Sequence, residues 1–103
     1  MSNYLQIFME YKVKQENIQD YEKAMEEILK ELPEFGASNI QWFVATDQDD
    51  LYVEMFEVPT DSHYHALKKL RQCNDHHIFS KIAPMVEGGC EKIHCWAFKK
   101  KVE

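Results

Sequence analysis

The feature that most constrains this fold is a set of strand-like segments that are apolar on both faces. Residues 4–14 and 91–99 each alternate between two sets of side chains, and both sets include large apolar residues. A period of two is typical of a β-strand, because successive side chains point to opposite faces. The helix-like segments suffice to cover one face of the resulting sheet. The second face needs a partner, so the sequence predicts a homodimer.

Two further strands, 39–46 and 51–58, flank a polar turn and predict a hairpin. A two-residue loop at positions 48–49 would pair Val44 with Val53, and cross-strand partners share a face. This register places alternate residues of both strands on the face that the helices leave open. The predicted aromatic face comprises Phe8, Phe43, Tyr52, Phe56, Trp96 and Phe98.

The helices follow from apolar residues at steps of three and four. Such a stripe runs from Ile18 to Leu32, with Asn17 as the expected cap. A second helix is expected to start within residues 59–62, with Thr60 or Asp61 as its cap, and to continue, after a break, into a piece that Pro84 interrupts.

The predicted order is β-α-β-β-α-β in a single domain, residues 1–103. This order predicts an α+β, ferredoxin-like fold with a four-stranded antiparallel sheet and two helices on one face. The residue pattern resembles the dimeric α/β-barrel superfamily, which implies that two such sheets pack face to face.

Composition excludes several classes of function. The formal net charge of −6 disfavours nucleic-acid binding, which needs clustered basic residues. Neither a signal segment nor an apolar run of about 20 residues is present, so we expect a cytoplasmic protein without membrane partners. The three cysteines are expected to be reduced thiols. Three glycines leave no nucleotide-binding loop, and no cofactor is predicted.

The polar groups expected within the aromatic face are the candidates for chemistry. Glu54 and His94 are predicted to act as a general acid/base pair, with Glu10 beside them. The predicted ligand-binding residues are Phe8, Glu10, Phe43, Tyr52, Phe56 and Trp96. The alternative is that the polar groups only bond one another or the partner subunit.

Metal-ligand residue types are dense in one region: His63, His65, Cys73, His76 and His77. His63 and His65 are two positions apart, which puts them on different faces of a helix. Cys73 has ligand-type spacing to the last two histidines, but a helix break is expected between them. Surface histidines are the favoured interpretation, and no metal site is predicted.

The segments 51–58 and 75–85 carry a resemblance to the antibiotic biosynthesis monooxygenase-like (ABM-like) domains of the dimeric α/β-barrel superfamily. The second segment resembles that family's His–Phe run, which implies a catalytic role for His77 as donor or base at a cavity mouth. The alternative for His77 is a capping or packing role. The resemblance also brings haem degradation into consideration, because the haem-degrading members use a Trp from the second-helix region and a His on that helix. Trp42 and Trp96 lie on predicted strands, and Ala83 lies near the position of the haem-binding histidine, so haem degradation is disfavoured.

Two functions stay open. The first is a cofactor-independent monooxygenase-like homodimer, which acts on or binds a small aromatic or enolic molecule in a cavity between sheet and helices. The second is a non-catalytic, small-molecule-binding or stress-related dimeric module. The sequence does not decide whether the protein is an enzyme.

Overall fold

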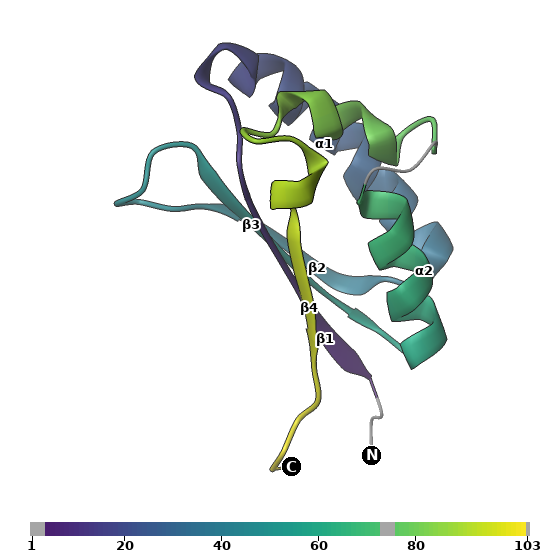
Figure 1. Ribbon diagram of the computed structural model, residues 1–103. Coiled ribbons are helices and arrows are strands. Elements are labelled where there is room, and N and C mark those ends of the chain that lie inside the picture. The colour runs from purple at the N-terminus through teal and green to yellow at the C-terminus, as the bar shows by residue number, and fades with distance from the viewer. Residues whose placement is uncertain (1–3, 73–75, 103) are drawn as a thin grey trace.

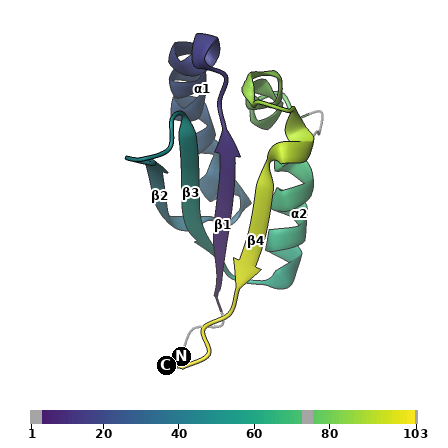
Figure 2. The same cartoon turned by 60° about the vertical axis from the view of Figure 1, so that its left-hand side comes forward.

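The computed structural model describes residues 4–72 and 76–102. The main elements are β1 (Leu5–Lys12), α1 (Ile18–Glu31), β2 (Ser38–Val44), β3 (Leu51–Val58), α2 (Asp61–Arg71) and β4 (His94–Phe98). The short 3-10 turns are η1 (Gln15–Asn17), η2 (Leu32–Phe35), η3 (Phe79–Met85) and η4 (Cys90–Lys92). All strand pairs are antiparallel, in the order β2-β3-β1-β4. The predicted ferredoxin-like fold is confirmed, and both helices lie on one side of the sheet (Figures 1 and 2).

The helices begin and end largely where the sequence indicates. The Thr60 hydroxyl caps α2 by accepting a hydrogen bond from the His63 backbone N–H at 3.2 Å. Asn17 precedes α1, but its side chain makes no capping bond, because the chain enters through the turn η1. After α1, Gly36 takes a φ of 92°, which a residue with a Cβ adopts only under strain.

The hairpin register differs from the prediction by one residue. Val44 pairs with Tyr52 rather than Val53, and Trp42 pairs with Glu54. The Ala45 N–H donates to the Leu51 carbonyl at 2.9 Å, which leaves residues 46–50 as the connection instead of a two-residue loop. Because side chains alternate, a slip of one position exchanges the two faces of a strand.

The register correction moves three predicted site residues to the helix side of the sheet. Tyr52, Glu54 and Phe56 are buried there, so their expected place on the open face was wrong. The open face keeps its other aromatic residues. Trp96, Phe98 and Phe43 are 43%, 53% and 47% exposed, with Phe8 partly buried among them. A surplus aromatic face therefore exists, although it is smaller than predicted.

Two further expectations concern membranes and cysteines. Within residues 4–72 and 76–102, no helix has the length and apolar character needed to cross a bilayer. Cys90 is disulfide-bonded, which corrects the expectation of a reduced thiol there, whereas Cys95 is free and buried. Burial raises the pKa of the Cys95 thiol to about 11, as expected for a packed rather than a reactive cysteine. Cys73 lies outside the described residues.

Candidate functional site

The predicted acid/base pair of Glu54 and His94 does not form, because the two side chains lie on opposite faces of the sheet. Glu54 faces the helices and is completely buried. His94 is exposed, and its cross-strand partner on β1 is Glu10. Cross-strand partners share a face, so Glu10 takes the place beside His94 that was predicted for Glu54.

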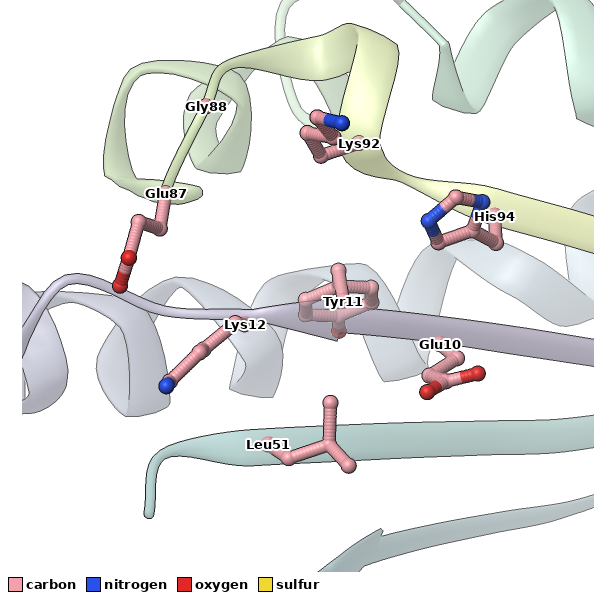
Figure 3. A pocket seen from close by; sticks show the side chains of 8 residues that line it. All are labelled: Glu10, Tyr11, Lys12, Leu51, Glu87, Gly88, Lys92 and His94. Atoms are coloured by element: carbon pink, nitrogen blue, oxygen red, sulfur yellow. The ribbon is translucent and has the colours of Figure 1, made fainter. Parts of the chain in front are cut away.

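A pocket of about 330 Å³ opens beside this pair, where β1 ends (Figure 3). Its lining residues are Glu10, Tyr11, Lys12, Leu51, Glu87, Gly88, Lys92 and His94. The volume is at the small end of the range for small-molecule sites, about 300–1,000 Å³. Figure 3 shows Glu10 and Lys12 coming from β1, and Glu87 and Lys92 from the segment that leads into β4.

Backbone hydrogen bonds fasten the wall of this pocket to the sheet. The Glu87 N–H donates to the Lys12 carbonyl at 2.7 Å, and the Lys14 N–H donates to the Met85 carbonyl at 2.8 Å. Gly88 takes a φ of +84°, and a Cβ there would lie 2.6 Å from the Lys92 side chain. The glycine therefore permits both the turn and the close approach of Lys92.

An aromatic platform continues from the pocket along the open face. The His94 and Trp96 rings are parallel within 9°, with centroids 5.8 Å apart. Phe8 lies 5.7 Å from Trp96 on the neighbouring strand. Flat apolar rings next to two lysines, two glutamates and a histidine suit a small aromatic molecule with an ionisable oxygen.

A second polar group, which we call the phenol network, lies between the sheet and the helices and consists of Trp42, Tyr21, Tyr11, Glu54 and Arg71. Arg71 donates to both Glu54 oxygens, at 2.8 and 2.6 Å, and both side chains are fully buried. The Tyr11 hydroxyl donates to Glu54 Oε2. The Tyr21 and Tyr11 oxygens are 2.6 Å apart, and the Trp42 indole N–H donates to Tyr21 at 2.9 Å.

Burial and the charge of Glu54 control proton binding in the phenol network. Burial, reinforced by the nearby Glu54 carboxylate, raises the pKa of Tyr11 and of Tyr21 well above the usual value for a phenol. Burial disfavours the Arg71 cation, but the attraction of Glu54 outweighs it and raises the pKa of Arg71. Glu54 accepts three hydrogen bonds from these groups and is fully buried, so an external substrate does not reach it.

The phenol network was not predicted from the sequence, although the residue pattern contains a signal for it. Arg71 follows Leu67 by four positions and so shares the inward face of its helix, while Glu54 alternates with residues of an apolar strand. Opposite charges on two buried surfaces of one small domain predict an internal ion pair. Within the described structure, the Arg71 Nε is buried without a hydrogen-bond partner, and the guanidinium lies 5.5 Å from the Phe79 ring centroid.

The remaining predicted residues have structural partners of their own. His77 is exposed and stacks on His76, with centroids 4.8 Å apart, so it is not part of either polar group above. His76 accepts hydrogen bonds from the backbone N–H groups of Ile78 and Phe79. Among residues 4–72 and 76–102, no cluster of three potential ligands could hold a metal ion.

No protein-family model matches the sequence, and no curated protein matches it. Solved structures do resemble it. One is described as "Putative antibiotic biosynthesis monooxygenase from Nitrosomonas europaea", with a TM-score of 0.74, 10% identity, and coverage of 98% of this chain and 93% of that one. A conserved protein from Methanosarcina mazei Go1 has a TM-score of 0.71, 13% identity and coverage of 96% and 94%. A dimeric ferredoxin-like protein from an uncultured marine organism has a TM-score of 0.65, 10% identity and coverage of 100% and 99%.

These similarities extend over nearly the whole chain. The protein therefore has the fold of the ABM-like, ferredoxin-like proteins, as the resemblance of its segments indicated. At such low identity the likeness establishes the fold alone, because one fold hosts many functions.

Proposed function

We propose that this protein is an ABM-like homodimer that binds a small aromatic or enolic molecule on its open face, as a cofactor-independent monooxygenase-like protein. The observation that carries the proposal is the pairing of Glu10 and His94 beside a lysine-containing pocket and an aromatic platform. This relocates the ligand from the layer between sheet and helices, where Glu54 is held by Arg71, to the face with accessible polar groups.

The open face also supports the homodimer. Its exposed aromatic residues would lose contact with water if two sheets packed face to face. Each large apolar side chain that becomes fully buried contributes about 1.5–3 kcal/mol. The dimeric ferredoxin-like structure from the marine organism shows that a protein of this fold can associate.

The proposed chemistry is deprotonation followed by shielding. His94 would take the proton from a phenol or enol, Glu10 would stabilise the resulting imidazolium, and Lys12 and Lys92 would stabilise the substrate anion. An electron-rich anion can react with O₂ without a bound cofactor, so the residues need only bind, deprotonate and exclude water.

The experiment combines light scattering with a thermal-shift screen of phenols and quinols. We expect a dimer at micromolar concentration and at least one ligand that raises the Tm. Stabilisation reaches about 2.7 kcal/mol when the ligand is at 100 times its Kd. His94→Gln should weaken binding, whereas His65→Gln, on the exposed surface of α2, is the matched control. A stable monomer, or equal binding in both variants, would contradict the proposal.

A non-catalytic module is the second candidate, and the buried state of Glu54 favours it. A carboxylate that is tied to Arg71 and Tyr11 stabilises the interior without touching a ligand. Oxygen consumption in the presence of each confirmed ligand distinguishes the two. Binding with no O₂ uptake indicates a module, and uptake that His94→Gln abolishes indicates an enzyme.

A further inference from the structure

We infer that the phenol network conducts one oxidising equivalent: an electron passes from Tyr21 to oxidised Trp42, while the phenol protons move toward Glu54. The inference rests on the direction of the hydrogen bonds, the contact between the rings and the separate exposure of Trp42. It does not depend on ligand binding at the open face.

The hydrogen bonds have a single direction. A phenol carries one hydroxyl hydrogen, and an ionised carboxylate only accepts. Since Tyr11 donates to Glu54, the 2.6 Å contact between the two phenols is a donation from Tyr21 to Tyr11. The Trp42 indole N–H can only donate, and it does so to Tyr21 at 2.9 Å. Every donor in the series therefore points toward Glu54.

The rings are close enough for an electron to move between neighbours. The ring centroids of Tyr21 and Trp42 are 5.9 Å apart, and those of Tyr11 and Tyr21 are 5.8 Å apart. Aromatic rings in van der Waals contact have centroids about 4.5–7 Å apart. Trp42 is partly exposed on the edge strand β2, whereas both tyrosines are buried. An oxidant in solution therefore reaches the network at Trp42.

The phenol network contains a proton acceptor, Glu54, and a buried phenol needs such an acceptor in order to be oxidised. A phenol cation in a low-dielectric interior is costly, so the electron leaves readily only if the proton also leaves. Oxidised Trp42 accepts an electron from Tyr21 and becomes neutral. The Tyr21 proton moves to the Tyr11 oxygen, and the former Tyr11 proton moves to Glu54. The products are a neutral tyrosyl radical and a protonated Glu54.

Arg71 makes this proton shift reversible. Its guanidinium donates to both Glu54 oxygens, at 2.8 and 2.6 Å, and so stays in contact with the carboxyl group before and after the proton arrives. The raised pKa of both phenols means that they hold their protons until an electron is removed. The first step is the oxidation of Trp42, and it requires a one-electron oxidant from solution, such as a small inorganic radical that is reduced to its anion.

Pulse radiolysis with the azide radical tests the relay. The protein has two tryptophans, so a Trp96→Phe background confines the indolyl radical to Trp42. We expect its absorption to decay as phenoxyl absorption rises, at a rate independent of protein concentration. Tyr21→Phe in this background removes the electron donor, so the coupled rise of phenoxyl absorption should be lost and the decay should slow at least about tenfold, which corresponds to about 1.4 kcal/mol of barrier.

Two further variants keep the test decisive. Tyr11→Phe removes the proton route but retains Tyr21, so it should also slow the transfer, and it serves if Tyr21→Phe does not fold. Tyr64→Phe is the control, because Tyr64 bonds the Cys95 carbonyl and lies outside the phenol network. The inference is overturned if the Tyr21→Phe and Tyr11→Phe decays match that of Tyr64→Phe, or if the decay rate scales with protein concentration.

Discussion

Removing the Arg71 cation while leaving the Glu54 carboxylate in place should severely destabilise the protein. In Arg71→Met, Glu54 loses two of its three hydrogen bonds and its only direct ion-pair contact in the described structure. Breaking a fully buried ion pair from one side costs about 3–5 kcal/mol, because the remaining charge stays in a low-dielectric interior. A domain of this size has a total stability of roughly 5–15 kcal/mol, so the Tm should fall by on the order of 20 °C.

The double variant separates the charge from the packing. In Glu54→Met with Arg71→Met, no charge is left, and Tyr11 retains the Met25 sulfur at 3.8 Å as an acceptor. Replacing a buried pair with apolar residues is often neutral, so we expect most of the lost stability to return. The assay is thermal unfolding, which gives the Tm, together with urea unfolding, which gives the free energy of unfolding; both are followed by circular dichroism for the single and double variants.

A surface ion pair provides the matched control. Lys81→Met breaks the contact of Lys81 with Glu27, at 2.7 Å but 41% and 52% exposed, and should leave the Tm almost unchanged. The reasoning is refuted if Arg71→Met unfolds within a few degrees of the unchanged protein, or if the double variant is as unstable as the single one.

Two other predictions concern alkaline pH and the pocket wall. Burial, with the Glu22 carboxylate, raises the pKa of Tyr52 to about 12. The contribution of the neutral Tyr52 phenol to stability is therefore complete at pH values below its unfolded-state pKa of about 10, and it is lost as the pH rises toward 12. Tyr52→Phe should make urea stability fall less over this range, and an unchanged pH profile would disprove the assignment. Gly88→Ala should lower the Tm more than Gly89→Ala, because both have positive φ but only the Gly88 Cβ meets Lys92. Equal losses would show that backbone strain alone is responsible.

Element order was predictable because it depends on local periodicity. The stripe of α1 and the alternation of β1 identify a helix and a strand without reference to the rest of the chain. The face exposed by β3 was not predictable in the same way, since it depends on how many residues the hairpin connection uses. Asp50 takes a φ of 60°, a conformation that the acidic turn sequence permits but does not require. The misplacement of Tyr52, Glu54 and Phe56 follows from the one-residue difference between the predicted and the observed register of β2 and β3.

The candidate site was partly predictable for the same reason. Phe8, Glu10, His94 and Trp96 lie on β1 and β4, whose alternation alone fixes their shared face. The phenol network needed knowledge of which helix residue meets which strand residue, and this depends on packing between elements far apart in the chain. Only the presence of opposite charges on two inward faces was visible beforehand.

The connection between β2 and β3 has a consequence for sequence change. Adding or deleting one residue in 46–50, with the strands otherwise kept, would rotate one strand by half a period relative to the other. Such a change in β3 would carry the carboxylate of Glu54 to the open face and leave Arg71 opposite an apolar side chain. A change of two residues would preserve both faces. Whether the number of residues in this loop is odd or even therefore limits which insertions the chain can accept, more than the composition of the loop does. We expect related proteins to differ in the length of this loop by an even number of residues.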